Sequence, residues 1–149
     1  MKSFAGRPIL KGHGRGPLLS TDQPVNFTAA FTKILNVFPR WRAEVRDRHH
    51  PWYKMNIGGK VLAVPACIGS TLTGLVLLDL VRLKAGPVAI IVDKSDTLLV
   101  SGVVLSEVWY DRSVPIVEYP TKELRANLRD GQIVEVDGDR GTITLVTGH

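Results

Sequence analysis

The sequence predicts one α/β domain over residues 1–149, with parallel core strands, antiparallel edge strands and a C-terminal hairpin. Two observations predict this class. From residue 60 onward, short apolar runs typical of buried strands alternate with segments of helical spacing, which indicates right-handed crossovers between parallel strands. The first and last parts of the chain are instead extended segments broken by turns. A chain of 149 residues can bury a sizeable core in a single domain.

The first part of the chain begins as extended segments and continues into a helical pattern. A glycine cluster interrupts residues 7–20, RPILKGHGRGPLLS, which predicts a bulged strand or a tight turn. The GHGRG stretch lacks the Lys-Ser/Thr pair of a phosphate-binding loop. Residues 26–38 carry apolar side chains at helical spacing and end before Pro39. With the basic, aromatic residues that follow, they predict a basic helical insert near 28–48.

The centre of the chain predicts a strand, a helix and a second strand in close succession. KVLAVP at residues 60–65 has the continuous apolar pattern of a buried strand. Residues 70–84 have helical spacing and run into Ala85-Gly86-Pro87, a common way for a helix to end. PVAIIVDK at residues 87–94 is the second buried strand.

The last third predicts two helices, a strand and a hairpin. Residues 95–111 favour a helix that begins after Asp96, although Gly102 and several valines weaken that preference. PIVEY at 115–119 predicts a third parallel strand, and residues 121–131 predict an exposed helix capped by Thr121. Residues 132–146 have the pattern of a hairpin that turns at 137–141.

Charge is distributed unevenly along the chain. Residues 1–60 contain 11 Lys and Arg against three acids, a net charge of +8, whereas residues 61–149 have a net charge of −3. A basic first part suits an acidic partner surface, a phosphorylated or carboxylated ligand, or nucleic acid. A solvated surface without a partner would show the same imbalance.

The composition excludes several kinds of site. A single cysteine, Cys67, rules out an internal disulfide framework and is too few for a zinc or iron–sulfur site built by this chain alone. His49 and His50 are adjacent rather than four residues apart, so they are not spaced as a helical metal pair. No apolar run has the length of a membrane span, and the N-terminal residues lack the apolar core of a secretory signal. We therefore expect a cytoplasmic protein with no membrane partner.

The junction between the strand at 60–65 and the helix at 70–84 is the candidate site. Gly69 lets the backbone turn sharply, and Ser70 begins the helix. Unpaired amides and the helix dipole there favour an anion, at the edge of the sheet where α/β proteins usually bind ligands. A serine in this place is a candidate nucleophile or base. On pattern alone a plain helix N-cap assisted by Thr73 is the commoner interpretation, and Cys67 is more often a small buried hydrophobe.

The order of these motifs resembles the swivel domain, or small subunit, of aconitase X. The Asp-x-x-His-Pro element of that family is carried by Asp47, His50 and Pro51, and its central Gly-Ser by Gly69 and Ser70. The resemblance covers most of the chain and implies a swivelling β/β/α fold. Five ordered segments match: GPLLSTDQPVNF, DRHHPWY, VLAVPACIGSTLTGLVLLDL, the stretch from GPVAIIVDK to PIVE, and GQIVEVDGDRGTITL.

The resemblance implies a hydro-lyase (dehydratase) subunit that is active only with a large subunit. Ser70 falls on the serine that aconitase-type enzymes use as a base. The resemblance also implies an iron–sulfur cluster or iron held mainly by the large subunit, with none bound by this chain alone and Cys67 as an additional ligand to consider. The substrate would be a small hydroxy acid. The residues expected to contact it are Gly69, Thr71, Thr73 and His50.

Two chemistries are known in that family, the dehydration of cis-3-hydroxy-L-proline and that of mevalonate 5-phosphate. The long insert and the DRHHPWY form favour the hydroxyproline branch, and a mevalonate 5-phosphate dehydratase small subunit is the alternative. Two departures from the family pattern bear on the substrate. The second Gly-Ser pair of the family is replaced by Thr73-Gly74, and the helical insert replaces a short glycine-rich loop.

Two interpretations from other classes stay open at this point. One is a basic module that binds nucleic acid or anions without catalysis, because basic residues interleaved with aromatic ones can bind single strands; the resemblance makes nucleic acid an unexpected partner. The other is an interaction domain without chemistry, in which Ser70 only caps a helix. The residues of the basic module would be Arg40, Arg42, Arg46, Arg48 and Lys54, with Trp41, Trp52 and Tyr53.

Overall fold

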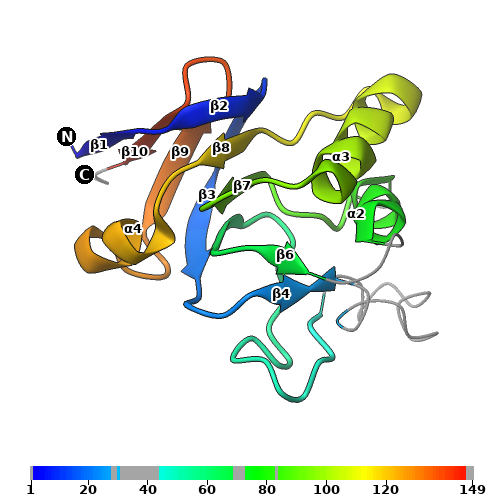
Figure 1. Ribbon diagram of the computed structural model, residues 1–149, viewed down its shortest axis with the longest axis horizontal. Coiled ribbons are helices and arrows are strands. Elements are labelled where there is room, and N and C mark those ends of the chain that lie inside the picture. Colours follow the sequence, from blue (N-terminus) through cyan, green and yellow to red (C-terminus); the bar gives the residue numbers. More distant parts are fainter. Residues whose placement is uncertain (1, 28–29, 31–43, 69–72, 83, 147–149) are drawn as a thin grey trace.

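The computed structural model describes residues 2–27, 30, 44–68, 73–82 and 84–146 (Figure 1). Most of the helix expected at 26–38 lies outside these residues, and the described residues 44–48 of the basic insert form no helix. Within the described part, no helix is long and apolar enough to cross a membrane. The strands are β1 (Ser3–Ala5), β2 (Arg7–Leu10), β3 (His13–Ser20), β4 (Val25–Asn26), β5 (Val61–Val64), β6 (Cys67–Ile68), β7 (Ala89–Val92), β8 (Ile116–Glu118), β9 (Ile133–Asp137) and β10 (Thr142–Leu145), and the helices are α2 (Thr73–Arg82), α3 (Thr97–Tyr110) and α4 (Thr121–Asn127).

An eight-stranded mixed sheet organises the described chain, in the order β1-β10-β9-β3-β5-β7-β8-β2. The pairs β3–β5, β5–β7 and β7–β8 are parallel, and the outer pairs are antiparallel. This confirms the predicted parallel core with antiparallel edges and a closing hairpin. The short parallel pair β4–β6 lies beside it.

The large sheet curls on itself, because its two edge strands are consecutive in the chain. Strand β1 pairs with β10 at one edge, β2 pairs with β8 at the other, and Gly6 alone separates them. The Gly6 amide donates to the Gly141 carbonyl at 2.8 Å, and a Cβ on Gly6 would collide with the Glu118 carbonyl oxygen. Glycine is therefore required at the corner where the chain passes from one edge to the other.

Both faces of the parallel strands are buried. Leu62, Val64, Ile90 and Val92 point to the face covered by α2 and α3. Alternate residues of the same strands, such as Ala63 and Ile91, point into the curl with residues of α4, β9 and β10. Burial on both sides explains why β5 and β7 are continuous apolar runs rather than alternating ones.

Helices α2 and α3 pack backbone against backbone at Gly74 and Gly102. A Cβ on Gly102 would lie 2.6 Å from the Gly74 Cα, and one on Gly74 would lie 2.7 Å from the Leu98 carbonyl oxygen. The glycine that weakened the helix prediction for residues 95–111 is thus required by packing. The Asp96 carboxylate caps α3 by accepting from the Leu99 amide at 2.9 Å, which confirms the expected helix start.

Two helix ends differ from the sequence prediction. Thr121 is the first residue of α4 rather than its cap, and the Asp93 carboxylate accepts from both its amide and its hydroxyl. After α2, Lys84 rather than Gly86 has the left-handed conformation, with a φ of 57°. The Ala85 amide donates to the Leu80 carbonyl and the Lys84 amide to that of Val81, which is a Schellman arrangement.

Gly102→Ala is expected to destabilise the chain by about 1–3 kcal/mol, because the new methyl group meets the α2 backbone, which has no side chain to move aside. Urea unfolding measures the change. Ser101→Ala, on the exposed face of the same helix, is the matched control and should stay within about 0.5 kcal/mol of the parent. Equal stability of the two variants would contradict the close helix crossing.

Candidate functional site

The structure describes the two flanks of the predicted catalytic junction rather than the junction itself. Gly69, Ser70 and Thr71 lie outside the described residues, and Thr73 is the first residue of α2. Strand β6 precedes the junction in the sequence and α2 follows it, so a strand before the junction and a helix after it are confirmed. The roles of these four residues stay predictions.

Strand β6 is held in place by the segment that follows β3. The Thr21 amide donates to the Ala63 carbonyl, and the Val25 amide donates to that of Ala66, both at 3.1 Å. Val25 is then in register with Cys67, and Asn26 with Ile68. The direction in which the chain leaves Ile68 toward the junction is therefore set by the segment from residue 20 to residue 26.

Three carboxylates at this edge of the sheet each accept two hydrogen bonds from a single residue. Asp93 accepts from the amide and hydroxyl of Thr121, at 2.8 and 2.7 Å. Glu118 accepts from the amide and hydroxyl of Ser95, both at 2.8 Å, and hydrogen bonding by the Ser95 amide holds the pKa of Glu118 below its usual value.

Asp130 completes the set by accepting from the amide and hydroxyl of Ser20, at 2.8 and 2.7 Å. The sequence analysis missed these three residues. Asp93 directly follows a buried strand and Glu118 ends one, which is the signal that would have found them.

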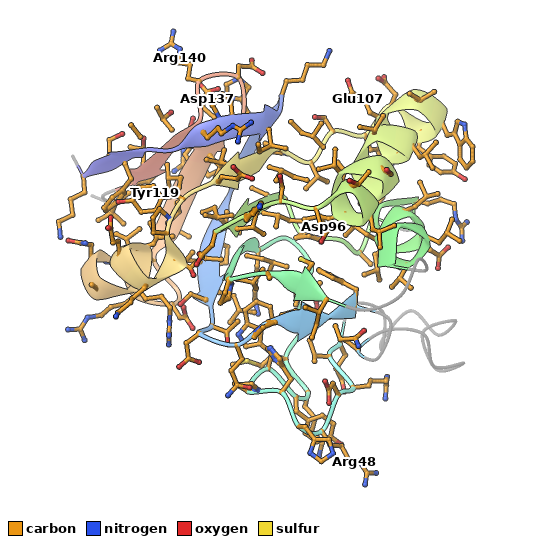
Figure 2. All side chains as sticks on the ribbon, in the orientation of Figure 1. Arg48, Asp96, Glu107, Tyr119, Asp137 and Arg140 are labelled. Carbon is orange, nitrogen blue, oxygen red and sulfur yellow. The ribbon has the colours of Figure 1, made fainter. Side chains whose placement is uncertain are left out.

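Cys67 is buried at the end of the core cluster, with 8% of its surface exposed. Burial, followed by the nearby Asp96 carboxylate, raises the pKa of its thiol to about 12. Figure 2 labels Asp96 at the start of α3. Because a thiolate is the form that binds metals, this environment suits a packed thiol better than a ligand.

The chain contains no second cysteine. An iron–sulfur cluster takes three or four protein ligands, so the residues present do not fit a cluster held by this chain alone.

His50, which the resemblance implies to be a substrate contact, is buried, with 7% of its surface exposed. Its Nδ1 accepts a hydrogen bond from the Trp52 amide at 3.0 Å, and the two rings meet edge to face. Desolvation lowers the pKa of His50, against the opposing effects of the Gln23 carbonyl, Asp47 and the Pro24 carbonyl. The ring is therefore neutral at physiological pH.

A hollow of about 440 Å³ lies at the carboxyl edge of the parallel strands. The Arg125 guanidinium in it is 3.9 Å from the Asp22 carboxylate. Exposed apolar side chains flank the junction: Ile68 before it, Leu75 on α2 and Leu98 at the start of α3. The hollow is lined by Asp22, Pro65, Asp93, Thr121, Lys122 and Arg125.

The residues that were candidates for binding nucleic acid do not all lie exposed on the surface. Trp52 is 2% exposed and donates from Nε1 to the Ser20 carbonyl at 3.2 Å, so its ring cannot stack on a base. Tyr53 is exposed, and Arg48 lies at the outer tip of its loop in Figure 2. Arg40, Trp41 and Arg42 lie outside the described residues. Burial of Trp52 removes one of the aromatic platforms that this interpretation needs.

One cluster of potential metal ligands occurs in the described part of the chain, formed by His13, Asp137 and Asp139. It lies at the amino end of β3, opposite the predicted junction. Asp137 already accepts from the amides of Asp139 and Arg140, so its carboxylate serves the hairpin turn. Figure 2 shows Asp137 and Arg140 at this turn, away from β4 and β6.

A sequence model of the aconitase X swivel domain matches residues 3–145. The chain is 31% identical over 137 residues to the phosphomevalonate dehydratase small subunit of Methanothermobacter thermautotrophicus, covering 92% of this chain and 95% of that protein. It is 34% identical over 110 residues to the cis-3-hydroxy-L-proline dehydratase of Pseudomonas aeruginosa, which is 74% of this chain and 18% of that longer protein.

Solved structures agree on the fold. Thermococcus kodakaraensis aconitase X, in a holo-form, matches with a TM-score of 0.81 at 24% identity, over 99% of this chain and 100% of that one. A 3-isopropylmalate dehydratase of Methanocaldococcus jannaschii matches with a TM-score of 0.59 at 15% identity, over 93% of this chain and 84% of that one. With a family match that spans nearly the whole sequence, the chain belongs to the aconitase X swivel domain family.

Proposed function

We propose that this chain is the small subunit of an aconitase X-type dehydratase and works with a large subunit. The match to the swivel domain family over residues 3–145 carries the proposal. Relatives matched along nearly their full length are named as dehydratase small subunits, which supports the same division into two chains.

We infer that Ser70 acts as the base. In the sequence it lies between β6 and the described start of α2. Free amides at a helix start would stabilise its deprotonated oxygen. An alcohol has a high intrinsic pKa, so such a base also needs a site from which water is excluded.

The surroundings of the junction support a site that a partner completes. Ile68, Leu75 and Leu98 are 50%, 55% and 38% exposed, which leaves apolar surface next to the predicted base. A large subunit seated on these side chains would exclude water from the junction. The chain has one cysteine, and its thiol is protonated, which supports placing the iron–sulfur cluster or iron in that partner. We place the two-subunit enzyme in the cytoplasm.

For the substrate, we favour cis-3-hydroxy-L-proline. The hollow at the carboxyl edge carries charges of both signs, with Asp22 and Asp93 beside Lys122 and Arg125. An imino acid has a carboxylate and an ammonium group, and it matches such a mixed surface. A phosphorylated hydroxy acid would bring several negative charges toward the two carboxylates.

Mevalonate 5-phosphate is the second candidate. The observation in its favour is the alignment with phosphomevalonate dehydratase small subunits, which spans 89–95% of those proteins at 31–32% identity. Lys122 and Arg125 would then contact the phosphate.

The assembled two-subunit enzyme should dehydrate cis-3-hydroxy-L-proline with a kcat/KM at least about tenfold above that for mevalonate 5-phosphate, a difference of about 1.4 kcal/mol. Formation of the dehydrated product from each substrate measures the preference. The reverse order would assign the phosphorylated substrate. No turnover of either compound by an iron-loaded complex would overturn both assignments.

Ser70→Ala in the assembled enzyme should lower kcat by about 10²–10⁴-fold while the two subunits still co-purify, because the proton-accepting oxygen is lost. Steady-state kinetics and gel filtration measure the two properties. Ser101→Ala on α3 is the matched serine control. Near-normal turnover, with a loss of only about 1 kcal/mol of stability, would reduce Ser70 to a helix cap.

Cys67→Ala should leave the iron content of the assembled enzyme unchanged, because the thiol is buried and protonated. Metal analysis of the purified complex gives the answer, with the wild-type complex as reference. Loss of iron from a variant that still assembles would make Cys67 a ligand.

A further inference from the structure

His50 is a buried polar residue that the proposed chemistry leaves without a role. Its Nδ1 accepts from the Trp52 amide at 3.0 Å, so the proton of the neutral ring is on Nε2. The Nε2 atom is fully buried and makes no hydrogen bond of good geometry within the described residues. The carbonyl groups of Gln23 and Pro24 nevertheless act on the ring and favour its proton, so the ring is close to that turn. A buried N–H group that lacks a well-aligned acceptor is unusual in a folded protein and needs an explanation.

The segment that His50 faces is anchored on both sides but not in its middle. On one side, Ser20 is held by Asp130 and by Trp52, and the Thr21 amide bonds to β5. On the other side, the Val25 amide bonds to the Ala66 carbonyl. Between the anchors, the Gln23 amide donates to the Thr21 hydroxyl at 3.1 Å, and Pro24 has no amide hydrogen to donate.

The same segment determines where β6 lies. Strand β4 begins at Val25 and pairs in parallel with β6, which places Val25 opposite Cys67 and Asn26 opposite Ile68. Ile68 directly precedes Gly69 and Ser70. A shift of the Gln23–Pro24 turn would move β4, then β6, and then the exit of the chain toward the junction.

We propose that His50 is a positioning residue: its ring, fixed between Trp52 and the Gln23–Pro24 turn, holds β4 against β6 and so sets the place of Ser70. The proposal rests on the proposed role of Ser70 and gives His50 an indirect part in the reaction. It differs from the sequence prediction that His50 contacts the substrate, because the ring is covered by protein.

Two variants separate the ring's shape from its polar atoms. His50→Phe keeps a ring but removes the acceptor at Nδ1 and the donor at Nε2. His50→Gln keeps an amide donor that reaches toward the Gln23–Pro24 turn. His49→Phe is the matched control, because His49 is the exposed neighbour in the same loop. All three are tested in the assembled two-subunit enzyme.

Misplacing a base acts on the transition state more than on substrate binding. His50→Phe should therefore lower kcat by about 10- to 100-fold with KM changed less than about twofold, and His50→Gln should restore part of the loss. A raised KM with unchanged kcat would instead indicate that His50 contacts the substrate directly. Unchanged kinetics would indicate that His50 has only a structural role. Either result overturns the proposal.

A second measurement does not depend on activity. Amide hydrogen exchange in residues 25–26 and 66–68 of the full chain should be faster in His50→Phe than in His49→Phe, while Val61–Val64 in the central sheet stays protected in both. Equal exchange at the β4–β6 pair would overturn the proposal. If the wild-type complex dehydrates neither substrate, the proposed function fails, and this measurement still decides whether His50 holds the β4–β6 pair.

Discussion

The functional edge of this protein depends on how the ends of the parallel strands are satisfied. Strands β3, β5, β7 and β8 end together, and the loops that follow carry amides without sheet partners. Asp93, Glu118 and Asp130 solve this by accepting an amide and a hydroxyl each, from Thr121, Ser95 and Ser20. Charge-assisted bonds of this kind fix the loops at this edge of the sheet.

The helices on the other side obey a second constraint, which is contact between backbones. Because Gly74 and Gly102 meet without side chains between them, the described start of α2 lies close against the backbone of α3. The start of α2 is thereby fixed from one side, while the β4–β6 pair fixes the end of β6 from the other. These two supports flank residues 69–72 in the sequence, and support on both sides would suit the catalytic group proposed there.

Much of this architecture follows from local sequence pattern. Three strands could be predicted because both their faces are apolar, at 61–64, 89–92 and 116–118. The hairpin could be predicted because its turn contains glycine, and Gly141 there has a positive φ. Long-range requirements were not identifiable. Gly102 lowers the helix preference of its own segment, and the contact with Gly74 that requires a glycine there comes from a different helix. Thr121 was predicted as a cap because its carboxylate partner, Asp93, is 28 residues away in the sequence. The burial of His50 could not be predicted from local pattern, because only the fold brings Gln23 and Pro24 close to its ring.

The proposed division of labour between two subunits follows from the physical needs of a serine base. An alkoxide is stable only where donors surround it and water is excluded, and this chain presents its junction beside exposed Ile68 and Leu98. A helix start alone lowers the pKa of a hydroxyl too little, since solvent screens the partial charges of its amides. With Ser70 as the proposed base, the domain would gain its chemistry only on closure against a partner. Iron held in the same partner would meet the proposed base only in that closed state.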